Sequence, residues 1–402
     1  MIAEDMMKLG KTRSVIREIF EYGNKRKQEI GADNVFDFSL GNPSVPAPDT
    51  VNQAIRDILE EMDSTELHGY TSAQGDAKVR KTIADYINKN FSAGVTADDI
   101  YMTVGAAASL TISIKALATE GDEFITFTPF FPEYRVFVEG AGAKLVTVPS
   151  RETDFQVEPA RLETAITEHT KAIILNSPNN PSGVVLSKET IQPICDILEK
   201  KQQEYGHEIY LITDEPYREL VYDDIEVPYL INYYDNTLVC YSFSKSLSLP
   251  GERIGYIVVS NRMKQAQDVY AAVCGAGRAL GFVCAPSLFQ RVVARCIGQT
   301  ADLSEYKKNR DLLYQALTKY GYQCVRPDGA FYLFVKAMEE DANAFCERAK
   351  QYELLLVPGD DFGCPGYVRI SYCVTTEQIE RALPAFEKLA NDYGKVTVQP
   401  RA

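Results

Sequence analysis

Histidine is scarce in this sequence, and its scarcity narrows the chemistry that the chain can perform. The three histidines, His68, His169 and His207, lie far apart along the chain. They form neither the closely spaced cluster that a metal site needs nor an obvious catalytic triad with a serine. We therefore expect no metal site.

Paired cysteines are missing as well. The chain has nine cysteines, an odd number, and no CxxC motif. Several of them lie inside apolar runs, where a cysteine is a buried, reduced thiol. We therefore expect neither a zinc site nor a disulfide framework. Reduced thiols are typical of the cytoplasm, which is where the sequence places the protein.

Long apolar runs and a surplus of positive charge are also absent. No stretch approaches the ~18 uncharged apolar residues that cross a bilayer. Lys and Arg number 42 against 56 Asp and Glu, so the net charge is −14. Such an acidic chain is a poor partner for nucleic acid and for anionic membrane surfaces, because phosphate binding depends on cationic side chains. An anionic substrate would need a locally basic pocket.

From about residue 100 the sequence alternates short apolar runs with helical stretches. Seven runs rich in β-branched and aromatic residues are short enough to be buried strands. They are Tyr101–Val104, Phe124–Thr128, Lys144–Val148, Ala172–Asn176, Tyr210–Asp214, Leu238–Ser242 and Ile254–Val259. They predict an α/β fold in which a seven-stranded, mostly parallel sheet lies between helices. Ligands of such sheets bind beyond the carboxyl ends of the strands.

The last third of the chain has a different pattern, which predicts a smaller α+β domain. A helical stretch from about Leu288 to Tyr320 precedes three strand-like runs, at 331–335, 354–357 and 367–373, and a closing helix from Thr376 to about Tyr393. Near the N-terminus, apolar residues at Val15, Ile16, Ile19 and Phe20 predict an amphipathic helix. We expect a large domain of residues 49–290 and a small domain of residues 1–48 and 291–402.

The strongest chemical signal is SFSKSLSLPGERIG, residues 242–255. A predicted strand ends in Ser242, Ser244 and Lys245, and Arg253 follows eight residues after the lysine. An amine beside hydroxyls and a guanidinium suits Schiff-base formation next to a bound phosphate. A surface loop with one lysine and one arginine is the alternative interpretation.

Two further motifs follow neighbouring strands. Asp214 ends the apolar strand IYLITD, where a buried carboxylate is costly without a cationic partner such as a pyridinium N–H; capping of the next helix is the alternative. In NSPNNPSG, residues 176–183, two prolines stiffen the turn that presents Asn180. The amide of Asn180 could donate to a ligand oxygen, although the segment could also be an ordinary turn.

The last two motifs suit anions. In TVGAAASL, residues 103–110, small residues open a helix directly after a strand. This leaves the backbone N–H groups of Ala106 and Ala107 free to bind phosphate, unless the turn is only closely packed. In YVRISYC, Arg369 lies in a strand between apolar residues. There it could bind a carboxylate bidentately or face solvent.

Together, the order and spacing of these five motifs resemble the class I pyridoxal-phosphate aminotransferases, the aspartate aminotransferase-like family of fold type I. The resemblance extends from about Phe36 to the last helix. It implies pyridoxal 5′-phosphate as the cofactor, amino-acid and 2-oxo-acid substrates in a ping-pong reaction, and a homodimer with shared active sites.

The resemblance also implies a role for each matching residue. Lys245 is then the Schiff-base lysine and proton shuttle, and Asp214 pairs with the pyridine nitrogen. Tyr217 and Asn180 bind the phenolic oxygen of the ring. The remaining cofactor contacts implied are Ser242, Ser244, Arg253, the amides of Ala106 and Ala107, the stacking ring of Phe131, and Tyr70, in HGYTSAQG, which reaches the neighbouring subunit's phosphate.

Substrate contacts are implied for Gly41, through its backbone, and for Arg369, which holds the α-carboxylate together with Asn180. Arg278 follows Lys245 by 33 residues, and in acidic members an arginine some thirty-odd residues after the lysine binds a distal carboxylate of the partner subunit's substrate. The resemblance therefore implies aspartate or glutamate as one substrate. Capping of a helix end, or pairing with an acidic surface residue, is the alternative interpretation of Arg278. Ala107 stands where one subgroup has a lysine, and Tyr134 stands where some members have a histidine behind the aspartate.

Two other functions are compatible with the same motifs. A carbon–sulfur β-lyase or an eliminase on this scaffold would begin its reaction with the same residues. A non-catalytic cofactor-sensing domain, as in some transcription regulators, would need a basic DNA-binding domain, and none fits before residue 36.

Overall fold

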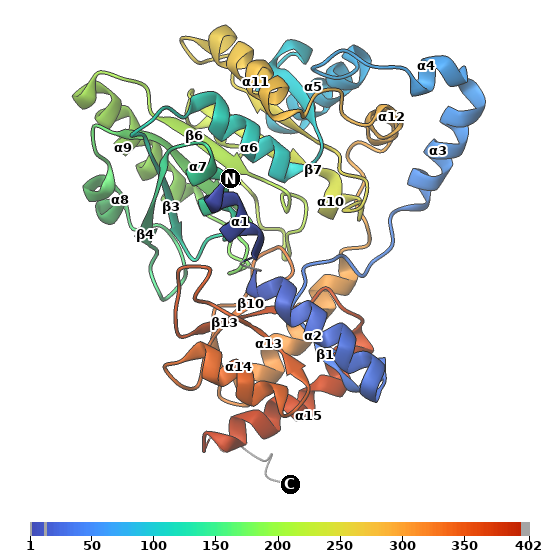
Figure 1. Cartoon of the computed structure of the whole chain (residues 1–402), viewed down its shortest axis with the longest axis vertical. Coiled ribbons are helices and arrows are strands. Elements are labelled where there is room, and N and C mark those ends of the chain that lie inside the picture. The colour runs from blue at the N-terminus through green and yellow to red at the C-terminus, as the bar shows by residue number, and fades with distance from the viewer. Residues whose placement is uncertain (1, 12–13, 395–402) are drawn as a thin grey trace.

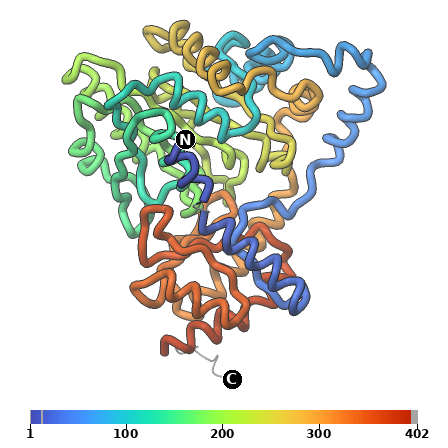
Figure 2. The backbone as a smooth tube through the Cα atoms, viewed as in Figure 1, coloured from blue at the N-terminus to red at the C-terminus, as the bar shows by residue number. Residues whose placement is uncertain are grey.

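The computed structural model describes residues 2–11 and 14–394 and has two parts (Figure 1). The large part contains one seven-stranded sheet with helices around it, and the small part contains two small sheets with helices. Blue N-terminal and red C-terminal segments both contribute to the small part, while the middle of the chain forms the large part (Figure 2). The α/β fold expected from the sequence is confirmed.

The large sheet contains all seven strands that the apolar runs predicted. They are β2 (Ile100–Thr103), β3 (Glu123–Thr128), β4 (Lys144–Pro149), β5 (Thr170–Asn176), β6 (Tyr210–Asp214), β7 (Thr237–Ser242) and β8 (Gly255–Val259). Their order is β2-β8-β7-β6-β5-β3-β4. Only β8 runs antiparallel to its neighbours within the described sheet, so the sheet is mostly parallel.

The register of the parallel strands brings polar strand ends to one edge. Asn176 at the end of β5 lies opposite Asp214 at the end of β6, and Asp214 lies opposite Cys240 of β7. β7 continues to Ser242, where the motif with Lys245 begins. The carboxyl-end rule therefore applies to this sheet.

Helices cover both faces of the large sheet and one of its ends. They are α3 (Asp49–Glu61), α4 (Ser64–His68), α5 (Ala77–Phe91), α6 (Ala106–Leu117), α7 (Glu133–Gly140), α8 (Pro159–Ala165), α9 (Lys188–Tyr205), α10 (Phe243–Ser246), α11 (Ala266–Leu280) and α12 (Ser287–Arg295). Alternate strand residues point to opposite faces. On β5, Ile174 packs with α6, α7 and α11, and Ile173 packs with α8 and α9.

The small part is built from both ends of the chain. Its strands are β1 (Phe36–Asp37), β9 (Gln323–Cys324), β10 (Tyr332–Lys336), β11 (Leu354–Leu355), β12 (Val357–Pro358) and β13 (Tyr367–Ser371). β1 pairs with β11, and the others form a four-stranded sheet of order β12-β13-β10-β9. Its helices are α2 (Val15–Ile30), α13 (Ser304–Lys319), α14 (Ala342–Lys350) and α15 (Thr376–Asp392), and α1 (Glu4–Lys11), which buries none of its residues, precedes α2.

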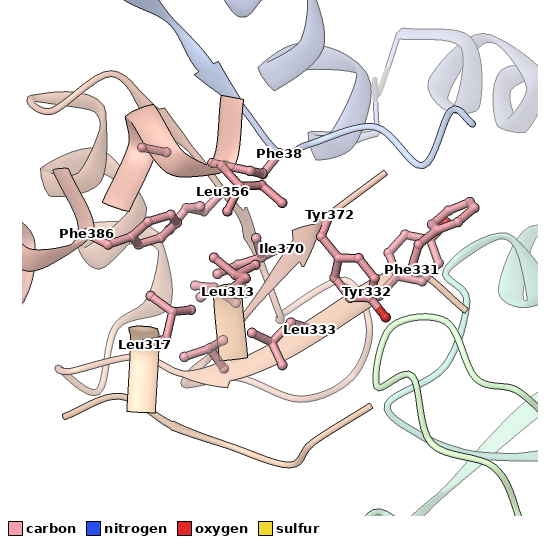
Figure 3. Close-up of a cluster of buried hydrophobic side chains, with 14 of the residues drawn as sticks. Phe38, Leu313, Leu317, Phe331, Tyr332, Leu333, Leu356, Ile370, Tyr372 and Phe386 are labelled. Atoms are coloured by element: carbon pink, nitrogen blue, oxygen red, sulfur yellow. The ribbon is translucent and has the colours of Figure 1, made fainter. Parts of the chain in front are cut away.

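A large apolar core holds most of the small part together (Figure 3), and a smaller separate cluster joins α2 to β11 and β12. Phe38 from the N-terminal segment packs there with Leu313 of α13 and Phe386 of α15, so distant segments close one core. Phe331 and Tyr332 lie at the side of this cluster that faces the large part (Figure 3). The small part thereby presents aromatic side chains to the edge of the large sheet where the polar strand ends meet.

The helical stretch expected from about Leu288 to Tyr320 is not continuous, because it forms two helices. α12 ends at Arg295, and Gly298 follows with a φ of +79°, which a residue with a side chain rarely adopts. The Asp302 carboxylate accepts a hydrogen bond from the backbone N–H of Ser304, where α13 begins. Val292 and Val293 of α12 pack in the core beside α3 and α5, and the domain boundary at 290 remains a prediction.

The described residues also bear on the features that the sequence lacks. No helix within residues 2–11 and 14–394 is long and apolar enough to cross a membrane. All nine cysteines are free thiols. In the same part of the chain, no three His, Cys, Asp or Glu side chains are grouped closely enough to hold a metal ion.

Candidate active site

A cavity of about 500 Å³ lies between the carboxyl ends of β5, β6 and β7 and the small part. Its size falls in the range of about 300–1,000 Å³ that is usual for small-molecule sites. The predicted site residues that line it are Gly41, Ala106, Ala107, Phe131, Asn180, Asp214, Tyr217, Ser242, Ser244, Lys245, Arg253 and Arg369. The five motifs, spread over more than 260 residues of sequence from Ala106 to Arg369, therefore meet in one place.

Lys245 lies on α10, directly beyond the end of β7. The Ser242 hydroxyl accepts a hydrogen bond from the backbone N–H of Ser244 and so begins this short helix. Lys245 Nζ donates to the Gly41 carbonyl at 2.7 Å. Burial lowers the pKa of Lys245 to about 8, and the nearby Arg253 guanidinium adds to the effect. A larger share of free amine makes this lysine a better nucleophile and base near neutral pH.

Asp214 at the end of β6 has one satisfied carboxylate oxygen and one free one. The Tyr134 hydroxyl donates to Oδ2 at 2.6 Å, and the Asn176 amide donates to the Asp214 carbonyl at 2.9 Å. Oδ1 is buried and has no hydrogen-bond partner among the described residues. Burial raises the pKa of Asp214 to about 7, and the Tyr134 hydrogen bond opposes that rise. A cationic N–H donor would satisfy the free oxygen.

Arg369 on β13 is buried with an exposed fraction of 2%, so the solvent-facing alternative does not hold. Its Nη1 donates to Asn180 Oδ1 at 3.1 Å, and Nη2 donates to the Ser39 carbonyl. The guanidinium lies 4.8 Å from the centre of the Tyr332 ring, and its Nε has no described partner. A buried guanidinium with a free N–H is prepared for a carboxylate.

Aromatic hydroxyls complete the wall beside Asn180. The hydroxyls of Tyr217 and Tyr332 lie 2.9 Å apart and hydrogen-bond to each other. A Cβ placed on Gly41 would come within 2.0 Å of the Tyr332 hydroxyl, so only glycine leaves room there. Residue 41 therefore brings bare backbone to the cavity, next to Lys245.

An anion cradle lies at the start of α6. Gly105 has a φ of +96°, and a Cβ there would lie 2.8 Å from Arg253 Nη2, so the backbone approaches this guanidinium closely. Ala106 and Ala107 follow in the first turn of α6, where backbone N–H groups have no helical acceptor. The Ser242 and Ser244 hydroxyls lie 2.7 Å apart nearby. Helix N–H groups, two hydroxyls and a guanidinium suit a phosphate.

Two predicted site residues do not line the cavity. Tyr70 follows α4, and its exposed fraction is 98%. Arg278 lies in the last turn of α11 and is exposed. Neither residue is brought to the cavity of its own chain.

Other residues of the cavity were not predicted from the sequence. Asn176 donates to Asp214 and accepts from the Asn180 backbone N–H at 2.7 Å. The strand-end argument that selected Asp214 would also have found it, because Asn176 ends β5. Tyr332, Glu133 and Arg17 line the cavity too. Arg17 lies in the first turn of α2, which Ser14 caps, and no local pattern marks it as a site residue.

Comparisons with known proteins give a consistent result. The sequence model of the family described as aminotransferase class I and II matches residues 33–386. A probable aspartate aminotransferase of Methanocaldococcus jannaschii is 29% identical over 94% of this chain and 96% of that protein. An amino transferase crystal structure from Eubacterium rectale is 57% identical, with a TM-score of 0.96 over 98% of this chain and 99% of that one. The aspartate aminotransferase of Thermus thermophilus, solved with maleate, is 25% identical, with a TM-score of 0.84 over 97% of this chain and 99% of that one.

Proposed function

Because the chain belongs to the class I and II aminotransferase family, we propose that it moves an amino group between an acidic amino acid and a 2-oxo acid with pyridoxal 5′-phosphate. That the chain is an aminotransferase, as its motifs predicted, is confirmed by the family match and its relatives. The observation that carries the proposal is the buried Asp214 Oδ1, unpartnered in the same cavity as Lys245 and Arg369.

The cavity fits pyridoxal 5′-phosphate in four respects. The free Asp214 oxygen suits a protonated pyridine nitrogen, and the first turn of α6 with Arg253, Ser242 and Ser244 suits the phosphate. Phe131 lines the same wall and suits stacking on the ring, and Tyr217 and Asn180 suit its phenolic oxygen. When bound, this cofactor supplies an aldehyde that reacts with amines and a ring that accepts the electron pair left at the substrate Cα.

The chain's own residues then orient the substrate and move its proton. Arg369 binds the α-carboxylate through its free N–H and so fixes the Cα position. The amine of Lys245, with its lowered pKa, removes the Cα proton and holds it for return. Asp214 keeps a proton on the nitrogen that it faces by supplying a buried negative charge. These roles remain proposals for each residue.

A substrate panel tests the proposed function. We expect an amino acid and a second 2-oxo acid to exchange their amino group with ping-pong kinetics. Release of pyruvate and a thiol from cystathionine with no 2-oxo acid present would instead indicate the β-lyase.

The acidic substrate is supported by the charge of the cavity. Arg17, Lys245, Arg253 and Arg369 line it, against the carboxylates of Glu133 and Asp214. Lys245, Arg253 and Arg369 have proposed roles, which leaves Arg17 for a second carboxylate. Arg278 is exposed on α11 and lies outside this cavity, so it would have to act on the partner subunit's substrate. Maleate, bound to the Thermus thermophilus relative, is a dicarboxylate.

Replacing Arg17 or Arg278 with alanine tests which guanidinium reads the distal carboxylate. We expect Arg17→Ala to lower kcat/KM for aspartate about tenfold or more, with alanine changed less than about twofold, because a charged hydrogen bond contributes about 1.5–3 kcal/mol. Arg278→Ala is expected to have the same selective effect if Arg278 binds the distal carboxylate of the substrate in the partner subunit. Steady-state kinetics with both amino acids measures each effect.

Arg17→Lys is the matched control, because it keeps the charge and should keep part of the preference for aspartate. An equal loss with aspartate and alanine would remove that arginine as a specificity determinant. If neither alanine variant loses more activity with aspartate than with alanine, neither arginine binds the distal carboxylate of an acidic substrate.

A homodimer with shared active sites is also proposed. Tyr70 is almost fully exposed, at 98%, and so is accessible to a second copy of the chain. We expect sedimentation velocity to give a dimer, and Tyr70→Phe to weaken cofactor binding about tenfold while the dimer persists, because a hydrogen bond to phosphate is lost. Tyr22→Phe, at another exposed tyrosine, is the control. A fully active monomer would contradict the proposal.

A further inference from the structure

A second cavity, of about 720 Å³, lies away from the candidate active site. It is formed by the end of α5, the loop that follows β6, and the segment around Tyr229. None of its lining residues also lines the first cavity. The proposed transamination leaves it without a function.

The wall of this cavity contains two buried oxygens without partners. Glu219 Oε1 lies 2.9 Å from the Tyr241 hydroxyl, but Oε2 has no hydrogen-bond partner in the part of the chain that is described. The hydroxyl of Tyr229, whose exposed fraction is 5%, is also unpartnered there. Buried polar atoms are nearly always satisfied, and leaving them unsatisfied is costly. Each oxygen could therefore accept a hydrogen bond from a ligand, because no described residue of the chain donates one to it.

Arg218, the arginine among the described lining residues of this cavity, donates to neither of these two oxygens. Arg218 pairs with Glu215, and its Nη1 and Nη2 donate to the Val227 and Pro228 carbonyls at 3.1 and 3.0 Å. Its charge is thus compensated first by Glu215, and it acts on the Glu219 carboxylate through charge alone, with no hydrogen bond described between them. Burial raises the pKa of Glu219 to about 7, against the opposing effects of Tyr241 and Arg218.

The other carboxylate of the cavity is already paired. Glu226 forms a salt bridge with Lys188, whose Nζ lies 2.9 Å from Glu226 Oε2. Glu219 is therefore the carboxylate of this wall that has room for a further cation. The Tyr241 hydroxyl holds the Glu219 carboxylate in position. That hydroxyl is itself positioned by Ser246, whose Oγ lies 3.0 Å away.

We propose that this second cavity binds a small organic cation with N–H donors, held by the Glu219 carboxylate and the Tyr229 hydroxyl. A planar cation such as an amidinium or a guanidinium matches a carboxylate with two parallel hydrogen bonds. Tyr86, Phe91 and Tyr229 line the cavity. The Phe91 and Tyr229 rings stack on each other, and the Arg218 guanidinium already lies over both, 5.1 and 4.9 Å from their centres. The Tyr86 ring is the aromatic surface that can contact a flat group of the ligand. The ligand class is therefore a cationic, partly aromatic molecule.

Benzamidine is a suitable probe, because its amidinium is cationic and it does not compete for the carboxylate-binding Arg369. Isothermal titration of the cofactor-loaded enzyme should show saturable binding of benzamidine, one per chain. Benzamide, its neutral analogue, should bind at least about tenfold more weakly. Saturating succinate, a dicarboxylate that the proposed function directs to the first cavity, should leave benzamidine binding unchanged.

Three variants test whether benzamidine binds in this cavity. Glu219→Gln should weaken benzamidine binding about tenfold or more, because a charged hydrogen bond is lost. Tyr229→Phe, which removes only an unpartnered hydroxyl, should weaken it about threefold and should fold even if Glu219→Gln does not. Glu226→Gln, at the paired carboxylate of the same wall, should bind benzamidine within about twofold of the parent.

Four results would overturn the proposal. They are no benzamidine binding, equal binding of benzamide, displacement by succinate, or equal losses in Glu219→Gln and Glu226→Gln. None of them touches the transamination assay, so this proposal fails or stands independently of the proposed function.

Discussion

Replacing Lys245 with alanine is expected to abolish transamination while the chain still folds. One amine is proposed to provide both the covalent link to the cofactor and the proton transfer at the substrate Cα. General acid–base catalysis alone is commonly worth 10²–10⁴-fold, so we expect a fall in kcat of about 10⁴-fold or more. The fold should persist, because the one hydrogen bond described for Nζ goes to the Gly41 carbonyl.

The measurements separate loss of chemistry from loss of structure. Lys245→Ala should keep the thermal transition of the parent and should still bind cofactor through the α6 cradle and Asp214. Borohydride reduction followed by peptide mass spectrometry should attach cofactor to Lys245 in the parent, and to no residue in the variant. Lys264→Ala, at an exposed lysine, is the control. Near-normal turnover in Lys245→Ala would show that another group is the nucleophile.

The strand ends explain why so much of this site could be predicted from the sequence. Strand periodicity fixes which residues end β6 and β7, and parallel pairing brings those ends to one edge. Asp214, Lys245 and Asn180 were therefore identified with no knowledge of tertiary contacts. Each of them also had an ordinary alternative interpretation, and the family resemblance decided between the two and added the roles.

Residues that reach the cavity over long sequence distances could not be found this way. Tyr332 meets Tyr217 across 115 positions, and it begins its strand β10, so the rule about carboxyl ends of strands does not select it. Arg17 is one charged residue among several on an amphipathic helix, and only the packing of α2 brings it to the cavity. Gly298, with its positive φ, is the sequence signal that divides the predicted helical stretch into α12 and α13.

Replacing Asp214 with asparagine is expected to have the second-largest effect. A neutral amide supplies no charge to hold a proton on the pyridine nitrogen, so the ring becomes a weaker electron acceptor. The isosteric amide keeps the volume, and Tyr134 can still hydrogen-bond to it. We expect kcat to fall about 10³-fold or more, with a near-normal thermal transition. Retention of more than about a tenth of the parent kcat would show that the charge of Asp214 is not needed.

Tyr134→Phe is a milder test of the charge of Asp214. It is expected to make cofactor binding depend more strongly on pH, in a direction that follows from the hydrogen bond between the two residues. The Tyr134 hydroxyl donates to Asp214 Oδ2 and holds down a pKa that burial raises to about 7. Without it, the pKa of Asp214 rises further, and less of the cofactor-free enzyme carries the carboxylate near neutral pH. Because the ionised form binds a protonated pyridine, the variant should bind cofactor several-fold more weakly than the parent at pH 7. The ratio of the two dissociation constants should fall toward one at alkaline pH, as Asp214 becomes ionised in both proteins. The cofactor's own titration cancels from that ratio. A ratio that does not change with pH would mean that Tyr134 positions Asp214 but does not set its charge.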